Sequence, residues 1–139
     1  MTTLKEIMTK DLTTVDGKTT LREVAQKMKT EDIGNVLIMD GDTLVGIVTD
    51  RDIVVRAVAD GKDTNAPVSE FATRDVFTMP CKTTVEEAAR AMAEKQLRRL
   101  PVTDTETGNI GGIVSLADLS TRTSGNADQK ALEGISQPG

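Results

Sequence analysis

Apolar residues recur at helical spacing in two stretches of the chain, each opened by a threonine with a glutamate three residues later. The spaced residues are Leu21, Val24, Ala25 and Met28 in the first stretch and Val85, Ala88, Ala89 and Met92 in the second. Spacing of i, i+3, i+4 and i+7 gives one apolar helix face, and a Thr-x-x-Glu box caps a helix N-terminus. The pattern predicts helices that begin after Thr20 and Thr84 and bury this face in a core.

Continuous apolar runs follow both predicted helices and indicate buried strands. A shorter extended stretch comes before each helix, and a helical lead-in precedes it at Leu4–Thr9 and at Pro67–Thr73. The predicted strands cover residues 12–15, 35–39 and 44–48 in the first half and residues 76–79, 100–103 and 110–114 in the second. A further helical stretch follows each last strand, so the order predicts an α/β (α+β) fold.

The two halves of the chain are copies of one pattern, which is the signature of an internal repeat. A shift of 64 positions aligns Glu6 with Glu70, Thr9 with Thr73, Asp11 with Asp75, Thr14 with Thr78 and Met28 with Met92. After a longer turn the shift becomes 66 and aligns Gly46-Ile47-Val48 with Gly112-Ile113-Val114. We interpret this as a duplication, with repeat one at residues 1–61, a polar linker at 62–66, repeat two at 67–125 and a C-terminal helix and tail at 126–139.

A hydroxyl residue and an aspartate stand at the same place in both copies, where a strand leads into a helix. Thr49 and Asp52 follow the first Gly-Ile-Val, and Ser115 and Asp118 follow the second. In open α/β sheets, ligands bind at this end of the strands. The same spacing is also that of a helix capping box. Both interpretations stay open, because one hydroxyl can serve a cap and a ligand.

Composition narrows the classes of function. The chain has 139 residues, a net charge of −5, no His, no Trp or Tyr and one Cys. Dispersed basic residues without stacking aromatics argue against nucleic-acid binding, and we find neither a bilayer-spanning apolar run nor a signal peptide. Without His there is no ready general acid–base group or activated nucleophile, and a lone Cys81 excludes a Cys-based zinc cluster. We expect a cytoplasmic protein that is not an enzyme and has no metal site.

The doubled order of strand, capped helix, two strands, Asp-terminated corner and helix resembles the CBS domain pair, or Bateman module. Further motifs that carry the resemblance are Met8-Thr9 in the lead-in and Lys-Thr-Thr before each helix. The likeness covers residues 4–123 and is strongest to small stand-alone bacterial proteins made only of a CBS pair. It implies tandem β-α-β-β-α repeats that pack with pseudo-twofold symmetry and leave two clefts for adenosyl ligands.

The resemblance also implies roles for individual residues. The corner hydroxyl and Asp would hold the ribose, through Thr49 and Asp52 in one cleft and Ser115 and Asp118 in the other. The first strand of the opposite repeat would frame the adenine. The framing residues would be Thr13 and Thr14 for the Asp118 cleft, and Phe77 and Thr78 for the Asp52 cleft.

A basic residue ahead of the second strand of a CBS repeat often meets the ligand's phosphates. Repeat two has Arg98 and Arg99 at this place, whereas repeat one has the uncharged Ile33-Gly34-Asn35. A guanidinium suits phosphate through its paired donors, and Arg98 is the better match. We therefore expect phosphate binding in the Asp118 cleft, while the Asp52 cleft is either empty or prefers an uncharged group. The alternative is that both arginines are a solvated pair at the start of a strand.

The resulting hypothesis is a regulatory module that senses adenosyl nucleotides and signals by a change of conformation or packing. Candidate ligands are AMP, ADP, ATP and S-adenosylmethionine, and no cofactor is required. We expect a homodimer with a protein partner that the sequence does not identify, and neither nucleic acid nor membrane as a partner. The alternative is a ligand-independent dimerisation or protein-interaction module with vestigial clefts.

Overall fold

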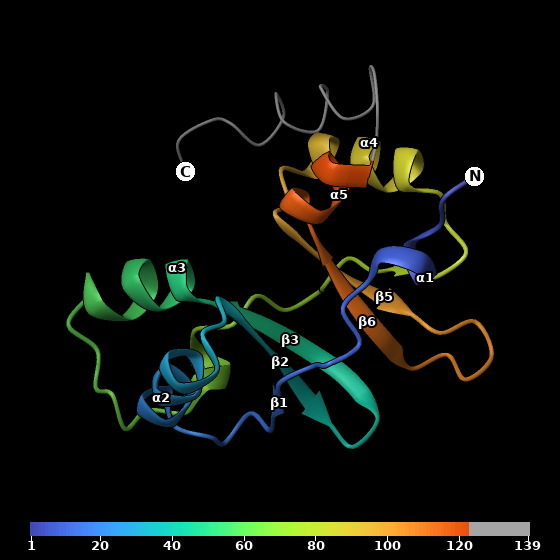
Figure 1. Cartoon of the computed structure of the whole chain (residues 1–139). Coiled ribbons are helices and arrows are strands. Elements are labelled where there is room, and N and C mark those ends of the chain that lie inside the picture. Colours follow the sequence, from blue (N-terminus) through green and yellow to red (C-terminus); the bar gives the residue numbers. More distant parts are fainter. Residues whose placement is uncertain (123–139) are drawn as a thin grey trace. The chain divides into compact units, whose positions relative to one another are not determined.

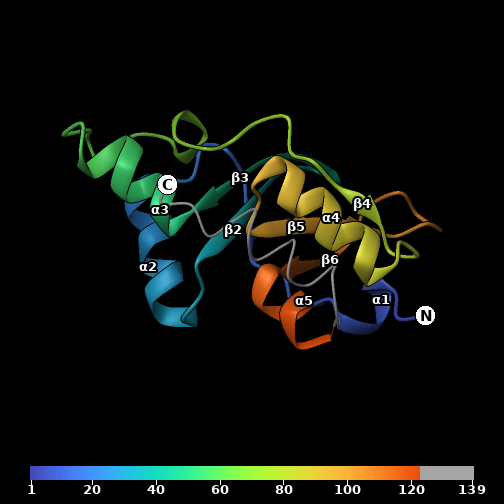
Figure 2. The ribbon, with the colours of Figure 1, turned by 90° about the horizontal axis from the view of Figure 1, so that it is seen from above.

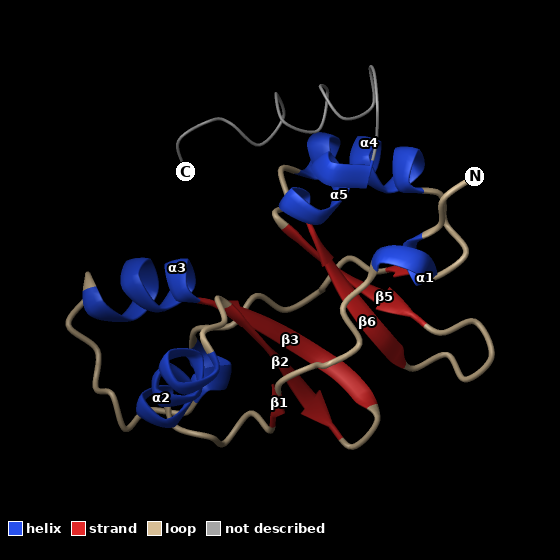
Figure 3. Cartoon of the chain, in the orientation of Figure 1, coloured by secondary structure: helices blue, strands red, loops and turns tan. Residues whose placement is uncertain are grey.

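The computed structural model describes residues 1–122, which form two compact units (Figure 1). One unit comprises Leu12–Val76 and is called the Asp52 unit; the other combines Met1–Asp11 with the chain from Phe77 onward and is called the Asp118 unit. Each unit has its own three-stranded sheet, accompanied by its own helices (Figure 3). None of the helices among residues 1–122 has the length and apolar character needed to cross a membrane.

The Asp52 unit contains a mixed sheet of order β1-β2-β3. Its elements are β1 (Thr14–Val15), α2 (Leu21–Glu31), β2 (Asn35–Asp40), β3 (Thr43–Thr49), α3 (Asp50–Asp52), the π-helix η1 (Ile53–Val58) and the 3₁₀ helix η2 (Val68–Glu70). β1 runs parallel to β2, and β3 runs antiparallel to β2. In this arrangement the last residue of β3, Thr49, pairs with the first residue of β2, Asn35.

The Asp118 unit repeats this topology with the sheet β4-β5-β6. Its elements are α1 (Leu4–Ile7), β4 (Met79–Pro80), α4 (Val85–Lys95), β5 (Arg99–Thr103), β6 (Ile110–Ser115) and α5 (Leu116–Arg122). Figures 1 and 2 show α4 and α5 side by side on this sheet. The predicted α/β class and the β-α-β-β-α order are confirmed, whereas the predicted C-terminal helix lies outside the described residues.

The predicted helix caps and most of the predicted core are present. Thr20 Oγ1 accepts a hydrogen bond from the Glu23 amide, and Thr84 Oγ1 accepts one from the Glu87 amide, both at 3.2 Å. All four spaced residues of α4 are buried, but in α2 the prediction was wrong for Ala25, which is exposed. The difference follows from packing, because α5 lies against α4 and covers a wider face of that helix.

The helix that follows α3 has π rather than α geometry. The Ala59 amide donates to the Val54 carbonyl and the Lys62 amide to the Ala57 carbonyl, both at 2.9 Å and both spanning five residues. Within η1 only Ala57 is buried. Three valines of η1 are exposed, and their exposed fractions are 58% for Val54, 48% for Val55 and 68% for Val58.

The lead-in of each repeat pairs with the last strand of the other repeat. Thr9 exchanges two backbone hydrogen bonds with Ile113 of β6, at 2.9 and 3.0 Å. Thr73, which aligns with Thr9, exchanges two with Ile47 of β3 at the same distances. Each compact unit therefore combines most of one sequence repeat with the lead-in of the other. The repeat boundaries predicted from the sequence describe the duplication and stay a prediction.

Gly112, the glycine of the second Gly-Ile-Val motif, has to be a glycine because Met8 of the lead-in packs directly on it. A Cβ on Gly112 would lie 2.6 Å from Met8 Cγ and Sδ and 3.0 Å from Met8 Cβ, whereas a Cβ on Gly111 would come no closer than 3.4 Å to any neighbour. We expect Gly112→Ala to lower the free energy of unfolding by about 1–3 kcal/mol through overpacking. Gly111→Ala, the matched control in the same strand, should change it by less than about 0.5 kcal/mol.

Urea unfolding of both variants measures this difference. Met8→Ala in the Gly112→Ala background should recover part of the loss, because it removes the clashing side chain. Equal stability of the two glycine variants would contradict the close packing of Met8 on Gly112.

Candidate ligand-binding corners

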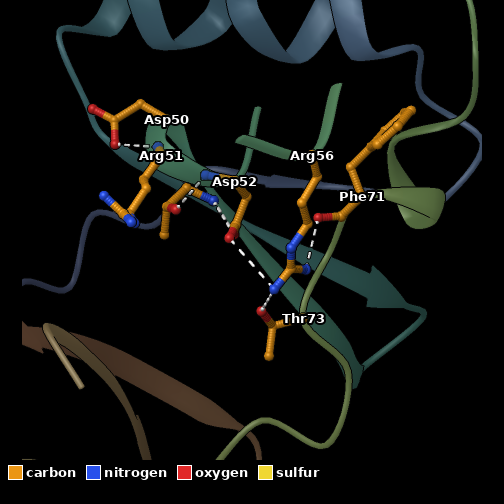
Figure 4. Close-up of polar contacts among 7 residues, drawn as sticks. Asp50, Arg51, Asp52, Arg56, Phe71 and Thr73 are labelled. Carbon is orange, nitrogen blue, oxygen red and sulfur yellow. Dashed lines mark hydrogen bonds and ion pairs between the residues drawn. The ribbon is translucent and has the colours of Figure 1, made fainter. Parts of the chain in front are cut away.

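The first corner joins β3 to α3 in the Asp52 unit. Thr49 Oγ1 accepts a hydrogen bond from the Asp52 amide at 3.1 Å, and the Thr49 amide donates to Asp52 Oδ2 at 2.9 Å (Figure 4). The first amides of a helix lack partners within it, so these reciprocal bonds fix the start of the helix. Both side chains are half-buried, with 16% of the Asp52 side chain exposed.

The second corner has the same geometry in the Asp118 unit. The Asp118 amide donates to Ser115 Oγ at 3.1 Å, and the Ser115 amide donates to Asp118 Oδ2 at 3.0 Å. The capping interpretation is therefore confirmed at both corners. It does not exclude a ligand, because a carboxylate oxygen can accept more than one hydrogen bond, and a hydroxyl that accepts one hydrogen bond still has a proton to donate.

Arg56 is a residue at the first corner that the sequence reasoning missed. Its Nη2 lies 3.8 Å from Asp52 Oδ1 and donates to Thr73 Oγ1 at 3.4 Å, while its Nη1 donates to the Phe71 carbonyl at 3.2 Å (Figure 4). The spacing of four residues between Asp52 and Arg56 on a predicted helix is the signal that points to this pair. Arg56 thus links the corner to the lead-in that carries Phe71 and Thr73.

The Arg56 guanidinium lies beside Asp52 in repeat one, where the stretch Ile33-Gly34-Asn35 ahead of β2 is uncharged. The Arg56 side chain is 46% exposed, so its ion pair contributes at most about 1 kcal/mol to stability. In the sequence, Arg122 follows Asp118 at the same spacing.

The structure brings the predicted phosphate-binding arginines next to the second corner. Arg99 pairs with Ser115 across β5 and β6. The Arg98 carbonyl accepts a hydrogen bond from the Leu116 amide, the first residue of α5, at 3.0 Å. Arg98 is exposed, and Arg99 is half-buried with its Nη1 donating to the Arg98 carbonyl at 3.2 Å. The phosphate-binding role of both residues stays a prediction.

Two of the predicted adenine-framing residues lie in the Asp52 unit. Thr13 Oγ1 donates to Glu31 Oε1 at 2.6 Å, and the Thr13 carbonyl accepts from the Leu37 amide at 3.0 Å. Thr14 is an exposed residue of β1. These bonds fix the backbone beside β2, and the framing role of Thr13 and Thr14 stays a prediction.

The other two framing residues lie in the Asp118 unit, just before β4. Phe77 is half-buried, and the Lys95 Nζ sits 4.6 Å from the centre of its ring. Such a cation over an aromatic face is attracted by the ring quadrupole. Thr78 is half-buried beside it in the chain. The framing role of Phe77 and Thr78 also stays a prediction. Among residues 1–122 no three His, Cys, Asp or Glu side chains gather as metal ligands.

Comparison with known proteins places these corners in a family. The model of the CBS domain family matches the chain twice, at residues 4–58 and 68–124. The CBS domain-containing protein YhcV of Bacillus subtilis is 36% identical over 137 residues, which cover 98% of this chain and 96% of that protein.

Two of the similar solved structures illustrate the fold. The crystal structure of Hypoxic Response Protein I with two coordinated zinc ions is 36% identical with a TM-score of 0.76, covering 88% of this chain and 100% of that one. The CBS domain pair of protein MJ0100, in complex with 5′-methylthioadenosine and S-adenosyl-L-methionine, is 28% identical with a TM-score of 0.77. That match covers 88% of this chain and 95% of the other.

Proposed function

This chain belongs to the CBS domain family as a tandem pair, and we propose that it is a regulatory module that binds an adenosyl ligand at its strand-to-helix corners. The observation that carries the proposal is the duplicated corner, in which a half-buried aspartate and a hydroxyl face the start of a helix. A carboxylate accepts hydrogen bonds from both ribose hydroxyls, and charged hydrogen bonds are the strong ones. The adenosyl ligands bound by the MJ0100 pair support this choice of ligand class.

The two corners differ in the basic residues that stand beside them, so we propose different ligands for them. Arg98 and Arg99 stand next to the Ser115–Asp118 corner and supply a phosphate site for AMP, ADP or ATP. At the other corner Arg56 already donates to the lead-in. Phosphate recognition is therefore proposed for the Asp118 corner alone, and the Asp52 corner takes an uncharged adenosyl group if it binds a ligand.

Signalling requires that the ligand binds two states with different affinity, because only differential affinity shifts an equilibrium. We propose a homodimer in which a second copy covers the exposed valines of η1. CBS pairs associate through helical faces, as the family resemblance implies, and three exposed valines on one short helix form such an apolar face. No catalytic role is proposed.

The capping boxes support a second candidate function. Reciprocal caps explain both the hydroxyl and the aspartate of each corner without any ligand. On that account the chain is a dimerisation or protein-interaction module whose corners serve stability only.

Thermal unfolding with a ligand panel separates the two functions. The panel contains AMP, ADP, ATP, S-adenosylmethionine and 5′-methylthioadenosine, with GMP as the control. A ligand at about 100 times its dissociation constant adds roughly 2.7 kcal/mol to stability, which raises the Tm of a domain this size by several degrees. We expect that rise for at least one adenosyl ligand and none for GMP. A flat response across the panel would favour the ligand-independent module.

A further inference from the structure

The Asp52 unit contains a cavity away from its corner. The cavity has a volume of about 220 Å³ and lies where β1 ends and β3 begins, whereas the corner lies where β3 ends. Its lining residues are Gly17, Ile38, Val45, Gly46, Ser69, Ala72 and Arg74. All of them belong to Leu12–Val76, so this one unit builds the cavity.

The aligned residues of the other unit fill the corresponding space. Gly17 aligns with Cys81 and Ala72 aligns with Met8, at the shift of 64 positions. Cys81 is buried in the core of the Asp118 unit, and Met8 packs against that core and over Gly112. The cavity therefore arises from two small residues at positions where the duplicated partner has larger ones.

The cavity has an apolar floor and a polar rim. Ile38 is buried, and Val45, which is 42% exposed, also lines the cavity. Ser69 and Arg74 add a hydroxyl and a guanidinium. An adjoining depression adds Lys18 and two acids.

The two acids line the adjoining depression and are not among the residues that line the cavity itself. They are Asp16 and Asp40. Asp16 Oδ1 already accepts hydrogen bonds from the backbone amides of Lys18 and Thr19, at 2.8 and 3.2 Å. Among the lining residues of the cavity itself, Arg74 is the one charged side chain, and it stands beside the apolar floor.

We propose that this cavity binds a small carboxylate with an apolar body, as a site separate from the adenosyl corners. The body would lie on Ile38, Val45 and Ala72, and the carboxylate would pair with Arg74, whose guanidinium matches it with two parallel donors. The cavity's volume of about 220 Å³ suits a small occupant, since drug-sized ligands fill pockets of about 300–1,000 Å³.

Titration of the intact protein with benzoate and with 4-methylpentanoate, followed by amide NMR, tests the proposal. We expect saturable shifts of the Gly17, Gly46 and Ser69 amides. Ala72→Met copies Met8 of the other unit and should abolish the shifts by filling the cavity. Arg74→Gln should weaken binding about tenfold or more, the loss expected for a charged hydrogen bond.

Gly17→Cys fills the cavity from the other side and replaces Ala72→Met if that variant does not fold. Loss of saturable shifts in either folded filling variant supports the site. Absence of saturable shifts in the wild type, or shifts that persist in a filled variant, would overturn it. Unchanged affinity in Arg74→Gln would overturn the carboxylate class. The response to adenosyl ligands should be the same in wild type and Ala72→Met, which keeps this test independent of the proposed corner function.

Discussion

Replacing both Val54 and Val58 with aspartate is expected to convert the proposed homodimer into a monomer. These valines are 58% and 68% exposed on η1, next to Val55. In the proposed dimer a second copy covers them, and burying an unpaired carboxylate in an apolar interface costs several kcal/mol. Sedimentation velocity at micromolar concentration should show a single dimeric species for the wild type and a single monomeric species for the double variant.

Val45→Asp is the matched control for this change. Val45 is 42% exposed, comparable to Val55, but it lies on β3 rather than on η1. Its variant should remain dimeric, and circular dichroism should show the same helix content for all three proteins. A double variant that stays dimeric would contradict the assignment of the valine face to a second copy.

Asp118→Asn is expected to weaken adenosine phosphate binding by roughly 10- to 100-fold. The substitution removes the charge that the ribose hydroxyls would meet, and a hydrogen bond to a charged group contributes about 1.5–3 kcal/mol. Asparagine keeps an oxygen that can accept from the Ser115 amide, so the helix cap is retained. Isothermal titration with AMP measures the loss.

Two further variants separate the ligand role from the cap. Asp118→Ala also removes the cap and should lower the free energy of unfolding without ligand by about 1 kcal/mol, whereas Asp118→Asn should leave it nearly unchanged. Asp52→Asn should leave the phosphate-binding affinity at the Asp118 corner unchanged. An Asp118→Asn variant that binds AMP as tightly as the wild type would assign that aspartate to capping alone.

Local patterns along the chain were sufficient to predict the elements and the corners. The Thr20 and Thr84 boxes both cap helices as predicted, because the cap depends on residues only three positions apart. The hydroxyl and aspartate of each corner meet for the same reason. These contacts are short in sequence, so their residue types and spacing determine them.

Features that depend on contacts between distant segments of the chain were not predicted from the sequence. The lead-in pairs Thr9 with Ile113, more than 100 residues away, and a single bridged residue leaves no strand pattern in the sequence. Ala25 is exposed because no neighbouring element among residues 1–122 covers that side of α2. The spacing of apolar residues within α2 does not contain this information. The cavity, in contrast, was readable from the aligned pairs Gly17 with Cys81 and Ala72 with Met8, once the lead-in was known to pack on the sheet.

The measurement that tests the central claim most directly is an amide NMR titration of the wild type with AMP. The amides of Ser115 and Asp118 form the reciprocal cap bonds, so a ribose on the Asp118 carboxylate must change their environment. We predict saturable shifts of both amides, with smaller changes at Thr49 and Asp52. If the amide resonances of all four corner residues stay unchanged as AMP is added in large excess, the binding of AMP at the corners is contradicted.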